Sequence, residues 1–265
     1  MKIIKDQREY SPHLYDLSNA VDDIEFYLSQ IDKKIHNVLE LGCGTGRVLI
    51  PLAKKEVNIT GIDYSPAMIT ECLRKIKEQE LTGKANAIMG DICDFQLDKT
   101  FDMIIASFRV IQALETIEEL NNCLDCIKKH LSTGGFCILN AFNPSLLKEE
   151  MEKSWRKEGE TFCWEKIDSE TGHKIIHFDE RQKIDPANQV LYPTMIYRVY
   201  DGDKLINEVR QDIVMKYYYP EEFESIILNA GFEIQEKYGG YHGEKYGQGK
   251  ELVIKFIREG PRIKN

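Results

Sequence analysis

The chain has 265 residues, of which 42% are hydrophobic and 30% are charged, a composition that excludes a disordered chain. The length suits one α/β domain with an insertion or at most two domains, and no apolar run approaches the ~20 residues that cross a membrane. The 44 acidic and 35 basic residues give a net charge of −9, and because such a chain repels phosphate backbones, we expect no nucleic acid partner.

The first ten residues, MKIIKDQREY, contain no apolar signal region, so we expect a cytoplasmic protein without a membrane partner. Residues 1–33 show helix-like apolar spacing and are expected to form an N-terminal helical cap. A region of alternating strands and helices follows. The expected strands are residues 35–41, 57–63, 86–91, 101–107 and 134–142, and the expected helices are residues 46–53, 65–80 and 116–131. Since the strands are apolar on both faces, residues 34–155 predict a doubly wound, parallel α/β core.

The pattern changes after about residue 156. Residues 156–219 read as about four strands joined by turn-like segments, which predicts an inserted antiparallel β meander. This meander is either a substrate lid or a small sheet with its own core or a dimer surface, and the chain is expected to be a monomer or a homodimer. Residues 220–260 then read as a helix and a β hairpin that complete the core sheet.

The seven cysteines are an odd number, which favours reduced thiols. Cys123 and Cys126 form a C-x-x-C pair inside the predicted helix at residues 116–131. A zinc site needs two further ligands, and no second pair follows at a suitable spacing. We interpret the two thiols as buried helix residues, with a metal or redox site as the alternative, and expect no metal.

A glycine-rich loop follows the first core strand, with the sequence Glu40-Leu41-Gly42-Cys43-Gly44-Thr45-Gly46. Alternate glycines allow a sharp turn and let a ligand lie against the bare backbone, at the edge of the sheet where α/β proteins bind ligands. The spacing is G-x-G-x-G and differs from the G-x-G-x-x-G of dinucleotide sites. The carboxylate of Glu40 suits a cationic ligand better than a pyrophosphate.

This stretch resembles the first motif of the class I S-adenosylmethionine (SAM)-dependent methyltransferases, an acid followed after one residue by G-x-G-x-G. The resemblance covers about residues 36–145 and the end segment from Pro220 to Arg258. It implies a Rossmann-like, seven-stranded sheet and a loop that binds the methionine and ribose parts of SAM. In such a site Glu40 lies near the amino group of SAM.

Asp63 ends the second core strand, 21 residues after Gly42, where an acid accepts hydrogen bonds from ribose hydroxyls. The alternative is that Asp63 caps the following helix, but Ser65 already suits that position. By the resemblance, Tyr64 and Met68 pack near the adenine.

Two later strand ends complete the expected site. Asp91, with Asp94 as the alternative, corresponds to the acid that faces the adenine amino group in the family, and Ile92 offers an N–H and an apolar surface to the ring. The fourth strand leads into Ser107, Phe108 and Gln112, which we expect beside the transferred methyl group.

The sequence does not identify a catalytic base. Tyr15 lies in the N-terminal cap, where the resemblance places a residue near the sulfonium, although a packed cap aromatic is an equal alternative. His13, His173, His177 and His242 are further candidates with little to separate them.

These features predict a SAM-dependent methyltransferase that methylates a nitrogen or oxygen nucleophile of a small molecule. A non-catalytic SAM-binding regulatory protein is the first alternative. An NAD-dependent oxidoreductase is the second, and it is disfavoured by the glycine spacing.

Overall fold

The computed structural model describes residues 2–6, 9–18, 22–144 and 148–259. The chain divides into two compact units. Residues 1–19 and 146–216 form the first, and residues 20–145 and 217–265 form the second. No helix in the described part of the chain combines the length and the apolar character needed to cross a bilayer.

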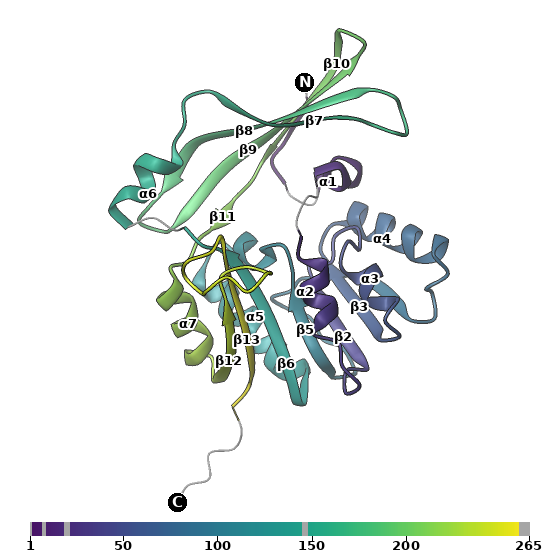
Figure 1. The fold of residues 1–265 in the computed structure, drawn as a ribbon, viewed down its shortest axis with the longest axis vertical. Helices are drawn as coiled ribbons and strands as arrows, with labels where there is room; N and C mark the ends of the chain where they lie inside the picture. Colours follow the sequence, from purple (N-terminus) through teal and green to yellow (C-terminus); the bar gives the residue numbers. More distant parts are fainter. Residues whose placement is uncertain (1, 7–8, 19–21, 145–147, 260–265) are drawn as a thin grey trace, which may run out of the picture. The chain divides into compact units, whose positions relative to one another are not determined.

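The second unit is built on a seven-stranded sheet in the order β12-β13-β6-β5-β2-β3-β4 (Figure 1). Its strands are β2 (Asn37–Leu41), β3 (Asn58–Asp63), β4 (Ala85–Met89), β5 (Phe101–Ala106), β6 (Leu131–Phe142), β12 (Phe232–Tyr238) and β13 (Glu251–Arg258). The pairs among β2 to β6 are parallel, whereas β13 is antiparallel to both β6 and β12. The predicted doubly wound, seven-stranded sheet is confirmed.

Helices cover both faces of this sheet. The helices of this unit are α2 (Ile24–Ser29), α3 (Leu49–Ala53), α4 (Pro66–Glu78), the 3₁₀ helix η2 (Val110–Ala113), α5 (Ile117–His130) and α7 (Pro220–Asn229). Buried side chains of α5 and α7 pack in one apolar cluster, and those of α2, α3 and α4 pack in another. The strands contribute alternate residues to the two clusters, because neighbouring strand residues point to opposite faces. This explains why the strands read as continuous apolar runs.

One helix of the second unit is shorter than expected, and another carries the C-x-x-C pair. The helix expected at residues 46–53 begins at Leu49, because the preceding residues form the turns of the glycine-rich loop. Cys123 and Cys126 are buried on α5, as the simpler interpretation of the C-x-x-C pair has it.

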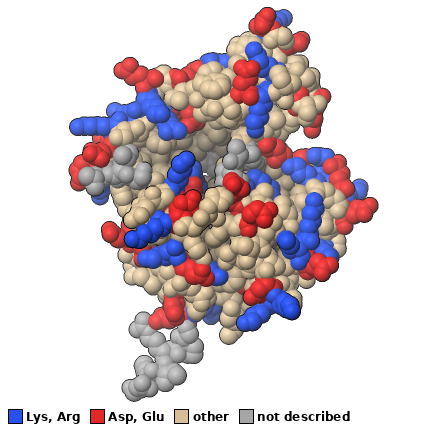
Figure 2. Space-filling model, viewed as in Figure 1, with Lys and Arg blue, Asp and Glu red and all other residues tan. Residues whose placement is uncertain are grey.

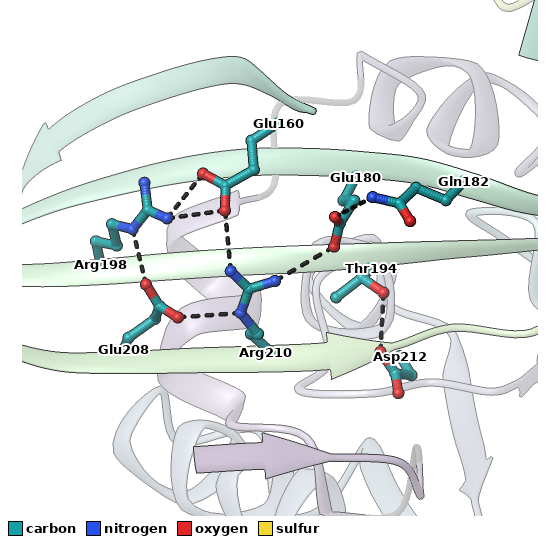
Figure 3. Close-up of polar contacts among 8 residues, drawn as sticks. All are labelled: Glu160, Glu180, Gln182, Thr194, Arg198, Glu208, Arg210 and Asp212. Atoms are coloured by element: carbon teal, nitrogen blue, oxygen red, sulfur yellow. Dashed lines mark hydrogen bonds and ion pairs between the residues drawn. The ribbon is translucent and has the colours of Figure 1, made fainter. Parts of the chain in front are cut away.

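The first unit contains an antiparallel sheet in the order β10-β9-β8-β7, extended at one edge by β1. Its strands are β1 (Lys2–Ile4), β7 (Glu160–Ile167), β8 (Lys174–Asp185), β9 (Val190–Asp201), β10 (Lys204–Asp212) and β11 (Met215–Lys216), and its helices are α1 (Pro12–Ser18) and α6 (Lys148–Trp155). The predicted meander is confirmed as β7 to β10. One face carries a network of acidic and arginine side chains (Figure 3), and the sheet has its own apolar cluster around Tyr197 and Val209.

The N-terminal segment is divided between the units, whereas the sequence suggested one cap over residues 1–33. β1 pairs with β10 in parallel, and Leu14 of α1 packs in the cluster of the antiparallel sheet. Tyr27 of α2 packs against the seven-stranded sheet. Helical periodicity shows that a segment has an apolar face but does not show which partner buries that face.

Two further elements depart from the sequence interpretation. α6 was not predicted, since only Met151 of this charged helix is buried. Tyr218 was read as part of the meander, but it lies in the second unit, is fully buried and stacks on Phe223 with ring centroids 5.5 Å apart.

Candidate functional site

The loop between β2 and α3 is shaped by glycines. Gly42, Gly44 and Gly46 have φ angles of +64°, +51° and +86°, a region that other residues rarely adopt. A Cβ atom on Gly42 would lie 2.5 Å from both γ-methyl carbons of Val110, so no side chain fits there. The two residues between the glycines, Cys43 and Thr45, are buried. The loop therefore presents bare backbone.

The Asp63 carboxylate joins this loop to the end of β3. Its Oδ2 accepts a hydrogen bond from the Gly44 N–H at 2.9 Å, and its Oδ1 accepts one from the Ser65 N–H at 2.9 Å. Burial raises the pKa of Asp63 above its ordinary value, and the backbone N–H groups of Ser65 and Gly44 act against this shift. The cap of α4 is the Ser65 hydroxyl, which accepts from Met68 N–H. Ser65 and not Asp63 therefore caps α4, and the alternative interpretation of Asp63 as the cap does not hold.

Glu40 lies at the end of β2 and is only 1% exposed. Its Oε1 accepts a hydrogen bond from the Ser107 hydroxyl at 2.9 Å, whereas its Oε2 has no hydrogen-bond partner among the described residues. Burial raises the pKa of Glu40 to about 8, against the opposing effects of the Ser107 hydrogen bond and the Arg47 charge. A buried carboxylate with an unbonded oxygen is costly, and such atoms call for a functional explanation.

Sequence reasoning missed a charged group beside Glu40. Arg47, the residue after the last loop glycine, donates two hydrogen bonds to the fully buried Asp23, one of them at 2.8 Å. Its guanidinium carbon lies 5.2 Å from the centre of the Phe108 ring. The position of Arg47 next to the glycine motif was an available signal, but nothing in the sequence marked Asp23 as its partner.

Tyr27 of α2 is also buried beside these groups. Its hydroxyl has no hydrogen-bond partner among the described residues. Burial raises the pKa of Tyr27, and so do the nearby Tyr241, Asp23 and Glu40. Its ring centroid lies 6.2 Å from that of Tyr241, in the loop between β12 and β13. Asp23 and Tyr27 are four residues apart in the sequence, a spacing that places two side chains on the same face of a helix.

The expected adenine-side residues follow β3 and β4. Tyr64 is 43% exposed, and Met68 is buried on α4. Asp91 is exposed and its carboxylate accepts from the Cys93 N–H at 2.8 Å, while Ile92 is half-buried. The ends of the two strands lie side by side, since the Gly90 N–H donates to the Asp63 carbonyl at 3.0 Å.

The expected acceptor-side residues follow β5. Ser107 is buried and Phe108 is half-buried. Gln112 is fully buried, and its side-chain oxygen accepts from the Phe142 N–H at 2.8 Å. The amide of Gln112 therefore holds the end of β6 in place.

The remaining candidates lie in the first unit, apart from His242. Tyr15 is on α1, as is His13, whose Nε2 lies 3.1 Å from Asp168 Oδ2.

Three potential metal ligands among the described residues, Cys163, His177 and Asp179, have their donor atoms within 4.8 Å of one another. Arg181 already donates to Asp179 Oδ2 at 2.7 Å, so this carboxylate has a cationic partner.

Comparisons with known proteins identify the family of the chain. Residues 32–180 match the family model described as "Methyltransferase domain". A dTDP-3-amino-3,4,6-trideoxy-alpha-D-glucopyranose N,N-dimethyltransferase from Streptomyces venezuelae is 21% identical, over 86% of this chain and 88% of that protein. A ubiquinone biosynthesis O-methyltransferase from Rickettsia felis is 26% identical, over 48% of this chain and 49% of its own length.

Solved structures share the fold. A SAM-dependent methyltransferase from Clostridium acetobutylicum superposes with a TM-score of 0.76 at 19% identity, covering 94% of this chain and 97% of that one. The family model spans more than half of the chain, including the glycine-rich loop and Asp63. The chain belongs to the methyltransferase domain family.

Proposed function

We propose that residues 40–46 and Asp63 bind SAM, and that the enzyme methylates a nitrogen or oxygen nucleophile of a small molecule. The observation that carries this proposal is the buried Glu40 Oε2 atom without a hydrogen-bond partner. The ammonium group of SAM would supply the missing hydrogen bond, and its charge would favour the ionised carboxylate. The glycine loop suits the same ligand because backbone can approach it closely.

The other proposed site residues contact different parts of the cofactor. The Asp63 carboxylate accepts backbone hydrogen bonds from Gly44, Ser65 and Tyr64, and a carboxylate has about four acceptor positions, so capacity remains for a ribose hydroxyl. Tyr64, Met68, Asp91 and Ile92 form the proposed adenine side. Ser107, Phe108 and Gln112 form the proposed side of the methyl group, and Tyr15 is proposed to approach the sulfonium.

When bound, SAM would supply a methyl group already activated on a sulfonium, which the acceptor would take as the neutral thioether leaves. The residues of this chain therefore act by orienting the two reactants and by excluding water. A nitrogen nucleophile has to be neutral, and an oxygen nucleophile needs a proton acceptor. We assign no catalytic base.

An amino group of a sugar-like molecule is the first acceptor to test. The relative that matches 86% of the chain is named for N,N-dimethylation of an amino sugar nucleotide, whereas the ubiquinone O-methyltransferase matches 48%. Because it covers 86% of the chain, the longer match includes part of the antiparallel sheet as well as the core.

Further observations bear on the proposed partners, location and oligomeric state. On the face drawn in Figure 2, basic and acidic side chains are interspersed, which supports the proposal that nucleic acid is not a partner. All seven cysteines are free, which supports a cytoplasmic location. The antiparallel sheet packs its own apolar cluster, which is compatible with a monomer and with a homodimer.

Isothermal titration calorimetry with SAM and S-adenosylhomocysteine tests the cofactor site. We expect wild-type protein to bind both and Glu40→Gln to bind SAM at least about tenfold more weakly, since an ion pair becomes a neutral hydrogen bond. Unchanged affinity of Glu40→Gln would contradict the proposed site. A subsequent screen with labelled SAM against amino sugar nucleotides and phenols would separate the two acceptor classes.

A further inference from the structure

Two consecutive residues after β5 adopt an unusual backbone conformation. Phe108 and Arg109 have φ angles of +52° and +64°, although neither is glycine. This left-handed region is sparsely populated by residues with a Cβ atom, and it persists only where surrounding structure holds it. Strained residues of this kind concentrate at functional sites.

Two side chains from distant strands hold this turn. The Arg109 N–H donates to Asn140 Oδ1 at 2.8 Å, and Asn140 Nδ2 donates to Glu251 Oε2 at 3.0 Å. Glu251 also pairs with the Arg109 guanidinium, with one hydrogen bond from Nε at 3.2 Å and another from Nη2. Asn140 on β6 is fully buried, and Glu251 at the start of β13 is 8% exposed. The turn is thus held through both its backbone and its side chain.

This turn and its two flanking residues contact the proposed SAM loop at two points and the next residue, Arg47, at a third. The Ser107 hydroxyl donates to Glu40, and Val110 fills the space where a side chain on Gly42 would lie. The Phe108 ring packs on the Arg47 guanidinium. A shift of the turn would therefore move groups that define the loop at residues 40–46.

We infer that Asn140 and Glu251 are positioning residues for SAM binding. Among the described residues, the hydrogen bonds of their side chains join them to each other and to Arg109, and they act by holding Phe108 and Arg109 in the left-handed conformation. This inference rests on the proposed location of the SAM site at residues 40–46.

The test introduces glycine at position 109, where it can adopt a positive φ without the hydrogen bond that Asn140 supplies. Asn140→Ala removes the acceptor for the Arg109 N–H and should weaken SAM binding about tenfold, because the strain at Arg109 is then less well held. Adding Arg109→Gly should restore affinity to about that of the Arg109→Gly single variant, since glycine adopts a positive φ without strain. Adding Arg109→Ala removes the same guanidinium but keeps a Cβ atom, and it should give no rescue.

The affinities are measured by calorimetry on the intact protein, with circular dichroism to show that each variant is folded. Wild-type affinity of Asn140→Ala, or equal affinities of the two double variants, would overturn the inference. If Asn140→Ala does not fold, Arg109→Gly and Arg109→Ala are compared in the wild-type and Glu251→Gln backgrounds, and equal SAM affinities would again overturn it. Failure of wild-type protein to bind SAM would instead overturn the proposed function.

Discussion

The carboxylate of Asp63 accepts a hydrogen bond from the backbone N–H of Gly44 at 2.9 Å and so connects the end of one strand to the loop that follows its neighbour. The side chain is 7% exposed and also accepts from the Ser65 N–H. One carboxylate thereby orders the glycine loop and, in the proposed function, binds the ribose. Its loss should affect both folding and cofactor affinity.

Asp63→Asn is expected to weaken SAM binding at least about tenfold and to lower the free energy of unfolding by about 1–3 kcal/mol. The amide keeps the size of the carboxylate, but its NH₂ group replaces one of the two acceptors that face backbone N–H groups. Calorimetry and thermal unfolding measure the two effects. The exposed Asp98→Asn is the control and should change neither. Unaltered SAM affinity of folded Asp63→Asn would remove Asp63 from the site.

The raised pKa of Glu40 predicts that SAM binding releases a proton. Burial raises this pKa from 4.5 to about 8, so the ligand-free protein holds Glu40 protonated at pH 7. An ammonium beside the carboxylate would lower the pKa again and expel the proton. Calorimetry in buffers of different ionisation enthalpy should detect the release at pH 7 in wild-type protein and show less of it in Glu40→Gln. Equal proton release by the two proteins would contradict this role.

The same shift predicts how stability depends on pH. Since the folded pKa lies above the unfolded value, the folded state keeps a proton that the unfolded chain loses as the pH rises. This group's contribution to stability should fall by about 1.4 kcal/mol per pH unit between 4.5 and about 8 and then level off. Ligand-free Glu40→Gln should therefore be more stable than wild type at pH 8, although it binds SAM less well. Denaturant unfolding of both proteins at several pH values measures the difference.

Gly42 and Gly202 allow conformational strain to be separated from close packing. Their φ angles are similar, +64° and +57°, but a Cβ atom would lie 2.5 Å from Val110 at Gly42 and would meet nothing within 4 Å at Gly202. Gly202→Ala should cost about 1 kcal/mol of unfolding free energy and leave SAM affinity unchanged. Gly42→Ala should cost about 1–3 kcal/mol more and abolish measurable SAM binding. Similar losses of unfolding free energy for the two substitutions would show that Val110 can move away from the glycine loop.

The charged network of the antiparallel sheet is expected to contribute modestly to stability (Figure 3). Arg210 donates to Glu160 at 2.9 Å, to Glu208 at 3.0 Å and to Glu180 at 3.2 Å, which links it to three neighbouring acids. Arg210→Met should lower the unfolding free energy by about 1 kcal/mol, because partly exposed ion pairs are each weak.

Salt distinguishes this electrostatic effect from packing. The difference between wild type and Arg210→Met should shrink in about 1 M salt, where charges are screened beyond ~3 Å. Lys204→Met, at the exposed start of β10, serves as the control and should behave as wild type. A difference that is independent of salt would assign the effect of Arg210 to its packing.

The cysteines should differ sharply in reactivity. Cys163 is exposed, Cys93 is half-buried and the other five are buried. Burial and the nearby Asp179 raise the pKa of Cys163, so its reaction with a disulfide reagent should be slow at pH 7 and accelerate with rising pH. Folded protein should nonetheless show one thiol that reacts before the others, and Cys163→Ser should abolish that phase. A persisting first phase would identify Cys93 as the more accessible thiol.

Much of the fold and the donor side of the proposed site could be predicted from local patterns. The alternating apolar segments located β2 to β6, and the turn-separated runs located β7 to β10, because the period of apolar residues is set by strand and helix geometry. Glu40, the three loop glycines and Asp63 were predicted as site residues because each lies at or just after a strand end, and the role proposed for each depends on residue type and spacing.

Only the tertiary structure revealed the contacts that hold this site together. Arg109 and Glu251 are 142 residues apart, and Arg47 and Asp23 are 24 residues apart, so no local sequence pattern indicates either pair. Phe108 and Arg109 adopt the left-handed conformation although neither is glycine, so the sequence does not indicate it. The assignment of α1 and α2 to different units depends on which sheet buries the apolar face of each helix. Residue type and spacing determine local conformation and chemistry, whereas pairing, burial and strain depend on which distant groups the folded chain brings into contact.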